Sequence, residues 1–392
     1  MPRNRKPPLS AAALQGFKYF RVIHPLLQRL HDHATERDTA GNRQLFYDQY
    51  VALLLFYFFN PTVTSLRGLQ QASELDKVQE RLGCRRAALG SLSEASRVFD
   101  AALLRPLLGE LAAQARPVVV GKEAEALAHL TAADGSLWRG LPRMAWALWM
   151  DERHRGAKLH LHFDVLTGVP LDATVTPGAC SEPDQLRAML QAGRLYVVDR
   201  GYAAYGLPGA IRQARSSFIA RLREDAAFTA EHEQVLSSAA RAAGVVRDVV
   251  VRRLGTEHHK DEAGGPLRLV FVTTGPRGAG RPPGVLVLCT DRLDLAAELV
   301  SLAYRYRWSV ELFFRWLKQI LGLRHLVAES PEGVTLQVYA ALIACVLITA
   351  WAGRKATKRT FEMFCFYFLG WASEEEMQRH IEKLQRPKVD ST

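Results

Sequence analysis

The chain has 392 residues, with 51 Lys and Arg against 40 Asp and Glu, so its formal net charge is +11. Hydrophobic residues make up 48% and charged residues 23%, a globular composition that excludes a disordered chain and a disulfide-stapled miniprotein. Roughly 100–200 residues per domain predicts two or three domains, and the positive charge favours nucleic acid or an anionic membrane surface as the partner. The five cysteines are odd in number and scattered, which favours a reducing compartment. They form no C-x-x-C pair, which argues against a structural zinc site.

Helical patterns fill the first 120 residues. Residues 45–60 form a long apolar run, which Asn60-Pro61 ends, and shorter helical patterns follow at 65–83 and 91–115. The turn at Gly83 is typical both of a helix-turn-helix and of a plain helical bundle. Both interpretations predict a helical N-terminal region.

Strand patterns begin near residue 126. Residues 126–136 predict a strand that ends at Asp134-Gly135, and residues 158–178 predict a hairpin that turns at Thr167-Gly168. A helix at 181–193, a strand at 194–202, a helix at 206–214 and a strand at 216–225 follow. Three antiparallel strands followed by alternating helices and strands predict a mixed α/β sheet covered by helices.

Residues 225–296 interrupt this series with further strand patterns joined by polar, Gly- and Pro-rich stretches, which indicates a small β insertion. A long helical region at 293–322 follows, and the C-terminal quarter is helical to the end. Residues 334–351 approach the length of a membrane span. Gln337, the flanking threonines and the lack of a second span favour a buried core helix, so we expect no membrane contact.

Two aspartates follow apolar strand patterns. Asp134 and Asp199 each lie where a strand is expected to give way to a turn, and on adjacent strands their carboxylates could reach one hard cation. Each also has an ordinary explanation, because Asp is a common turn residue. Taken singly, neither aspartate defines a site.

Four polar side chains share one face of the predicted helix at 293–322. At about 100° per residue, Tyr304, Arg307, Glu311 and Lys318 fall at roughly 0°, 300°, 340° and 320°. Such a stripe can be a solvated face on which Glu311 pairs with Arg307. A tyrosine, two cations and a carboxylate beside Trp308, in a basic protein, favour a functional site instead.

The chain resembles the DDE transposases of bacterial insertion sequences, in the branch whose third acidic residue lies in a Y-x2-R-x3-E-x6-K signature. Tyr304, Arg307, Glu311 and Lys318 complete that signature. The family's first aspartate matches Asp134-Gly135-Ser136, and its second, in a D-R-G-Y context, matches Asp199-Arg200-Gly201-Tyr202. The resemblance covers about residues 130–330 well and the helical N-terminus weakly.

The resemblance implies an RNase H-like mixed sheet with helices on both faces, in which Asp134, Asp199 and Glu311 are the catalytic residues and bind two Mg²⁺ ions, or Mn²⁺ in their place. Two such ions activate an oxygen nucleophile and stabilise the leaving oxygen. Water would free a 3′-hydroxyl at the element end, and this hydroxyl would attack target DNA. Arg307 and Lys318 would contact DNA phosphates, with Tyr304 nearby. Arg200 and Tyr202 are further DNA contacts on this interpretation, although Tyr202 could equally pack beneath the next helix.

The same resemblance predicts the domain organisation. We expect a helical DNA-binding region at 1–120, an RNase H-like catalytic domain with C-terminal helices at 121–224 and 297–392, and a β-strand insertion domain at 225–296. Some relatives form hairpin ends with a tryptophan of this insertion, but all seven tryptophans lie outside residues 225–296. Whether excision passes through hairpin ends therefore stays open.

The partners follow from this interpretation. We expect double-stranded DNA, both the terminal inverted repeats of the element and the target, a homodimer on that DNA, and a bacterial cytoplasmic, nucleoid-associated location. Two alternatives stay open: an RNase H-like nuclease without strand transfer, and a catalytically silent DNA-binding derivative of a transposase. The presence of all three acids counts against the silent derivative.

Overall fold

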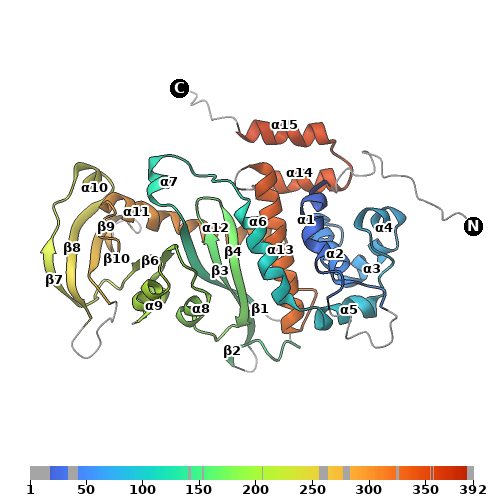
Figure 1. The fold of residues 1–392 in the computed structure, drawn as a ribbon, viewed down its shortest axis with the longest axis horizontal. Helices are drawn as coiled ribbons and strands as arrows, with labels where there is room; N and C mark the ends of the chain where they lie inside the picture. The colour runs from blue at the N-terminus through green and yellow to red at the C-terminus, as the bar shows by residue number, and fades with distance from the viewer. Residues whose placement is uncertain are drawn as a thin grey trace, which may run out of the picture. The chain divides into compact units, whose positions relative to one another are not determined.

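The computed structural model describes residues 18–33, 43–139, 143–151, 154–204, 206–255, 264–276, 283–323, 326–353, 355 and 357–385. The chain forms two compact units. Unit 1 comprises Met1–Arg116, Leu141–Trp146 and Arg315–Thr392, and unit 2 comprises Pro117–Gly140 and Ala147–Phe314. The chain thus passes between the units several times, and Figure 1 labels the helices and strands of each.

Unit 2 is built on one sheet, which in the described part of the chain has ten strands in the order β2-β3-β1-β5-β6-β10-β9-β8-β7, with β4 paired to β3. Strands β1, β3 and β4 are antiparallel, whereas β5 and β6 run parallel to β1. The strands are β1 (Leu130–Arg139), β2 (Leu148–Asp151), β3 (His154–Asp164), β4 (Val169–Pro177), β5 (Leu195–Val198), β6 (Ser217–Arg221), β7 (Phe228–Glu233), β8 (Val245–Leu254), β9 (Leu267–Pro276) and β10 (Pro283–Thr290). The predicted mixed sheet is confirmed, including the hairpin turn, where Gly168 has a φ of 71°.

Helices cover both faces of this sheet. Parallel strands need crossover connections, and α8 (Glu182–Met189) and α9 (Leu207–Gln213) supply them before β5 and β6. They pack with Tyr196 and Val198 in one apolar core, whereas α11 (Ala297–Tyr306) packs on β5 and β6 and the insertion strands. The alternate residue Val197 is fully buried as well, as expected when both faces are covered. The other helical elements of unit 2 are α7 (Lys122–Ala126), η4 (Arg200–Tyr202), α10 (Ser238–Ala242) and the first part of α12 (Trp308–Gln319).

The strands of residues 225–296 extend the same sheet, which differs from a separate insertion domain. Strand β10 pairs antiparallel with β6, with Leu288 opposite Arg221 and Thr290 opposite Ile219. The apolar core continues across this junction, because Val249, Leu269 and Val287 belong to the same cluster as the core residues of β5 and β6. Pairing of this kind satisfies the backbone hydrogen bonds at the edge of a sheet. Because it involves backbone atoms only, the sequence carries no pattern that predicts it.

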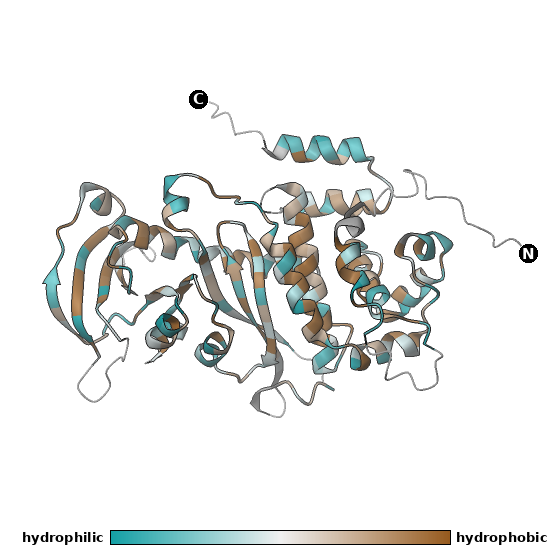
Figure 2. Cartoon of the chain, viewed as in Figure 1, coloured by the Kyte–Doolittle hydropathy of each residue, from teal (hydrophilic) through white to brown (hydrophobic). Residues whose placement is uncertain are grey.

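Unit 1 is helical, and its central helix is α13 (Pro331–Ala352), the one described helix that is long and apolar enough to cross a membrane. It packs against α2, α5 and α6 and is almost entirely buried, as predicted for a core helix. Figure 2 shows α13 as mainly hydrophobic and α15 as mainly hydrophilic. The helices of unit 1 are α1 (Lys18–Gln28), α2 (Tyr47–Phe59), α3 (Leu66–Ser73), α4 (Asp76–Leu82), α5 (Leu89–Val98), η3 (Ala101–Leu103), α6 (Leu104–Ala113), α13, α14 (Lys358–Phe368) and α15 (Glu374–Gln385).

The C-terminal helices therefore belong with the N-terminal ones, which differs from the expectation that residues 297–392 complete the catalytic domain. The reason is the apolar surface of α13, which the N-terminal helices bury. Gly83, in the left-handed region at the C-cap of α4, ends that helix as expected.

Gly333, in the first turn of α13, allows a close approach that the sequence alone does not reveal. A Cβ atom there would lie 2.6 Å from Ala328 Cβ and 2.8 Å from Ser96 Cβ. We expect Gly333→Ala to lower the free energy of unfolding by about 1–3 kcal/mol, because these neighbours must shift. Gly109→Ala in α6, where a Cβ has no neighbour within 4 Å, is the matched control and should be neutral or up to about 1 kcal/mol more stable. Urea unfolding of both variants measures this, and equal stability of Gly333→Ala and the wild type would contradict the packing.

Candidate active site

The first two acids occupy matched positions relative to the pairing of two parallel strands, with Asp134 on β1 and Asp199 directly after β5. Strand β1 pairs with β5 through Ala132 opposite Val197, and Asp134 and Asp199 each lie two residues further on. Both carboxylates are therefore at the carboxyl end of the parallel pair, where the working groups of α/β sheets gather.

Asp134 itself does not lie at a strand end, which corrects the expectation that β1 stops there. Strand β1 continues to Arg139 because β3 remains paired to it, with Asp134 opposite Leu161 and Arg139 opposite Gly156. What ends near Asp134 is only the pairing with β5. Asp134 therefore lies just beyond the point where the pairing between β1 and β5 ends.

Backbone amides orient one oxygen of each aspartate. Gly135 N–H donates to Asp134 Oδ1 at 2.8 Å, and Gly201 N–H donates to Asp199 Oδ1 at 2.7 Å. The second bond caps the short helix η4. The glycine after each aspartate therefore takes part in positioning its carboxylate.

The third acid reaches the site through an arginine. The helix predicted at 293–322 is interrupted at Arg307, between α11 and α12, and Glu311 lies one turn into α12. The Arg307 guanidinium is buried and contacts two carboxylates: Nη2 lies 2.5 Å from Glu311 Oε1, and Nη1 lies 3.7 Å from Asp134 Oδ2. It also lies 5.6 Å from the centre of the Tyr304 ring. The structure therefore brings Asp134, Tyr304, Arg307 and Glu311 together.

The remaining predicted residues are placed differently. Arg200 is exposed on η4, whereas Tyr202 is only 3% exposed and packs in the core beside Leu207. Its burial assigns Tyr202 to packing, the second of the two interpretations of the sequence, rather than to direct DNA contact. Lys318 lies two turns beyond Glu311 on α12, in the part that belongs to unit 1, and burial lowers the pKa of its ammonium.

A fourth acid, Glu182, lies in the same cluster and was missed by the sequence analysis. Burial raises the pKa of Asp134 to about 7; the Arg307 cation and the Gly135 N–H oppose this rise, and the charges of Asp199 and Glu182 add to it. Glu182 Oε1 lies 3.3 Å from Lys158 Nζ. In the sequence, Glu182 follows the helix cap Ser181 and is therefore expected in the first turn of a helix. Acidic residues are common there because the helix dipole stabilises them.

The donor chemistry of this cluster fits divalent metal ions, because carboxylate oxygens are the ligands that Mg²⁺ and Mn²⁺ prefer. Among the described residues, no three His, Cys, Asp or Glu side chains already converge as metal ligands do. In the structure, the Arg307 guanidinium forms ion pairs with the carboxylates of both Asp134 and Glu311.

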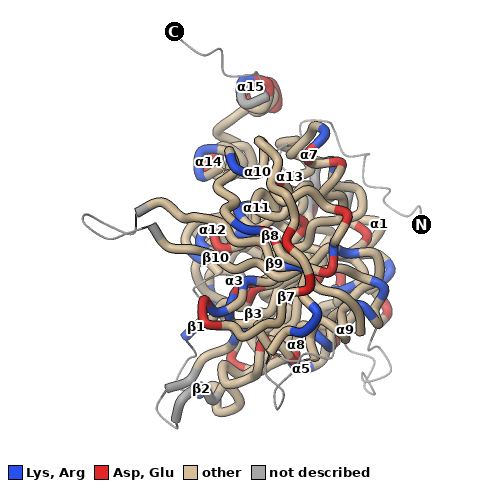
Figure 3. The backbone as a smooth tube through the Cα atoms, turned by 90° about the vertical axis from the view of Figure 1, so that its left-hand side faces the viewer, with Lys and Arg blue, Asp and Glu red and all other residues tan. Residues whose placement is uncertain are grey.

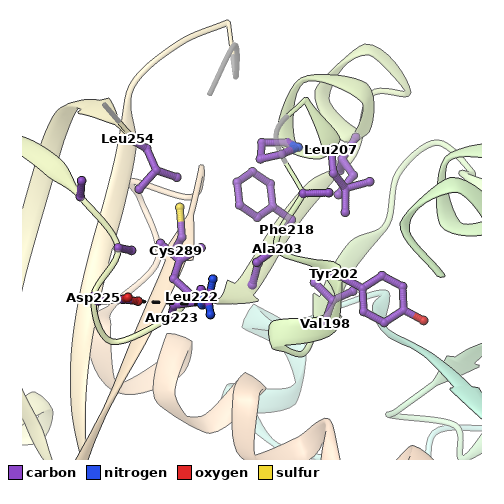
Figure 4. A pocket seen from close by; sticks show the side chains of 17 residues that line it. Val198, Tyr202, Ala203, Leu207, Phe218, Leu222, Arg223, Asp225, Leu254 and Cys289 are labelled. Atoms are coloured by element: carbon purple, nitrogen blue, oxygen red, sulfur yellow. Dashed lines mark ion pairs between the residues drawn. The ribbon is translucent and has the colours of Figure 1, made fainter. Parts of the chain in front are cut away.

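Unit 2 contains an apolar cavity of about 340 Å³, whose lining includes Val198 and Tyr202, on either side of Asp199 in the sequence, but none of the acids of the cluster. Phe218 and Leu207 line it on one side and Leu254 and Cys289 on the other, and Arg223 and Asp225 form an ion pair in its wall (Figure 4). Tyr202 also lines the cavity, but its ring is turned away from the other lining side chains in Figure 4. The cavity offers little polar chemistry, so the candidate active site is the carboxylate cluster.

Two aspartates at the carboxyl end of a parallel strand pair, with a glutamate from a later helix, are the arrangement of acids expected from the resemblance to DDE transposases. The family model described as "Transposase DDE domain" matches residues 127–347, and the chain belongs to this family. The matched region contains all three acids.

Relatives with curated names agree with this assignment. The chain is 29% identical over 197 residues to a protein of Sinorhizobium fredii named as a transposase, y4zB, a match that covers 50% of this chain and 53% of the relative. It is 25% identical over 221 residues to a Geobacillus stearothermophilus protein named as a transposase for insertion sequence element IS5377, covering 56% of this chain and 55% of the relative. The matches thus span about half the length of these relatives. Among solved structures, a piggyBac transposase synaptic complex with hairpin DNA superposes with a TM-score of 0.45 at 10% identity, over 96% of this chain and 87% of that one.

Proposed function

We propose that this protein is a DNA transposase that cleaves the ends of its insertion sequence and joins the 3′-hydroxyl ends to target DNA. The observation that carries the proposal is the meeting of Asp134 and Asp199 on paired strands with Glu311, which reaches Asp134 through Arg307. Family membership supports the same class of activity. Exchange of one phosphodiester for another needs no external energy source, and no phosphate-binding loop of the G-x-x-x-x-G-K-[ST] type is present in the sequence.

Asp134, Asp199 and Glu311 would hold two Mg²⁺ ions, with Mn²⁺ as a substitute. Such ions supply an activated oxygen nucleophile and neutralise the leaving oxygen. The chain's own residues orient the carboxylates: the Gly135 and Gly201 amides fix one oxygen of each aspartate, and Arg307 holds Glu311 toward Asp134.

Three cations are our proposed contacts of the DNA backbone. We assign Arg307, Lys318 and the exposed Arg200 to phosphates and place Tyr304 beside Arg307, as in the Y-R-E-K branch. Lys and Arg are spread over elements of both units rather than gathered in one (Figure 3). A homodimer that brings two element ends together, and a cytoplasmic, nucleoid-associated location, complete the proposal.

A phosphate contact at Lys318 predicts a change in the salt dependence of end binding. Each phosphate that a cation neutralises adds about 0.9 to the slope of log K against log salt concentration. We expect Lys318→Ala to weaken binding of the element ends at every sequence tested and to lower that slope by about 1. Fluorescence anisotropy between about 50 and 200 mM salt measures it, with the exposed Lys122→Ala as control. An unchanged slope for Lys318→Ala would count against the contact.

Two alternatives are separable from the proposal. An RNase H-like nuclease would cleave DNA without joining ends, and a silent derivative would bind ends without cleaving them. Imperfect inverted repeats bordered by short direct duplications around the gene would favour transposition. DNA carrying those repeats, incubated with the protein and Mg²⁺, should be cut at the element ends; binding without cleavage would support the silent derivative.

A further inference from the structure

Glu182 extends its carboxylate between the two aspartate turns. A Cβ atom built on Gly135 would lie 2.8 Å from Glu182 Oε1, and one built on Gly201 would lie 3.7 Å from Glu182 Oε2. Gly135 directly follows Asp134, and Gly201 donates its amide to Asp199. The absence of a side chain at Gly135 therefore leaves space that the Glu182 carboxylate occupies, whereas a Cβ atom at Gly201 would be in ordinary van der Waals contact with that carboxylate.

Helix α8 holds Glu182 in this position. Its N-cap Ser181 accepts a hydrogen bond from Asp184 N–H, and α8 packs against β1 and β3. A glutamate in a first turn is stabilised by the helix dipole wherever it points. Glu182 nevertheless points over β1, is only 27% exposed, and pairs with Lys158 of β3.

The cluster carries more negative than positive charge. The cluster contains the four carboxylates of Asp134, Asp199, Glu182 and Glu311. Arg307 pairs with Asp134 and Glu311, and Lys158 pairs with Glu182. Partly buried like charges repel each other unless cations offset them, so this arrangement favours binding of further positive charge.

We propose that Glu182 is a fourth carboxylate ligand of the divalent-cation site and that the Lys158 ammonium competes with the divalent cation for it. This inference rests on the proposed function, which assigns metal binding to Asp134, Asp199 and Glu311. The Lys158–Glu182 pair is then part of the cation site rather than a structural ion pair. Glu182 strengthens binding of the divalent cation, and Lys158 weakens it.

Mn²⁺ binding to the full-length protein, measured by isothermal titration calorimetry, tests the inference without an activity assay. Even outer partners of metal ligands contribute about 10–100-fold to affinity. We therefore expect Glu182→Gln to weaken Mn²⁺ binding at least about tenfold, while Asp184→Asn, an exposed acid on the same helix, leaves it unchanged. Lys158→Gln should strengthen binding, because the competing cation is gone. Circular dichroism and thermal unfolding of each variant check that it folds.

The outcomes separate the inference from the proposed function. Wild-type affinity in Glu182→Gln, combined with loss of binding in Asp134→Asn, would overturn the inference and leave the proposed function standing. Weakened binding in both Glu182→Gln and Lys158→Gln would identify a structural ion pair and would also overturn it. Absence of Mn²⁺ binding in the wild type, or undiminished binding in Asp134→Asn, would contradict the cation site itself.

Discussion

Replacing Asp134, Asp199 or Glu311 singly with alanine should abolish Mg²⁺-dependent cleavage of the element ends while leaving end binding intact. Residues that act as one catalytic unit each cost most of the rate when removed, so we expect a loss of about a thousandfold or more. Binding should survive because the proposed phosphate contacts are made by cations rather than by these acids. End-labelled DNA on a denaturing gel measures cleavage, and a mobility shift of the same DNA measures binding.

The control for these substitutions is Asp184→Ala, which removes an exposed carboxylate of α8 that pairs with Arg187. It should cleave at the wild-type rate. Undiminished cleavage by any one of the three alanine variants would remove that residue from the proposed catalytic set.

A buried ion pair between strands β8 and β9 should have the largest single effect on stability. Arg268 and Asp248 are each 3% exposed, and two hydrogen bonds of 2.8 and 2.6 Å join them. Arg268 also donates to the carbonyl of Leu295. Arg268→Met would leave the Asp248 carboxylate buried without its cation, and breaking one partner of such a pair costs about 3–5 kcal/mol. The midpoint of thermal unfolding should fall accordingly.

The matched control lies on β8, next to Asp248 in the sequence. Arg247 of β8 pairs with Glu233 at 2.6 Å, but these side chains are 40% and 59% exposed. Because water screens an exposed pair, Arg247→Met should cost less than about 1 kcal/mol. Replacing Arg268 and Asp248 together with apolar residues should recover much of the loss, since no charge is then stranded. Equal stability of Arg268→Met and Arg247→Met would contradict this account.

The sequence was sufficient to predict many of the local elements of unit 2, although not β2, β7, α7 or α10. Alternating apolar residues and the turn at Gly168 predict the β3–β4 hairpin, and Ser181 predicts the start of α8. Pairing between distant segments could not be predicted from the sequence, because the β6–β10 ladder is formed by backbone atoms that every residue carries. The same limit applies to α13, whose apolar sequence predicts burial but does not identify α2, α5 and α6 as the helices that cover it.

The candidate site was predictable in part. Its three proposed acids were identified through their motifs. In the structure, Asp134 and Asp199 each lie two residues beyond the last paired positions of β1 and β5, and Arg307 connects Glu311 to Asp134. Glu182 was missed because the helix dipole alone explains an acidic residue in the first turn of α8. Only its close approach to Gly135 in the folded structure indicates a further role. The position of Arg307 between two carboxylates likewise depends on the break between α11 and α12.

We propose that this carboxylate cluster transfers DNA strands. Its most direct test is to supply an element end already cleaved to a 3′-hydroxyl, with a target plasmid and Mg²⁺, and to measure joined product. We predict joined product with the wild-type protein and none with Asp199→Asn, although both bind the end. Wild-type protein that cuts DNA but yields no joined product, or an Asp199→Asn variant that joins ends as the wild type does, would contradict the account.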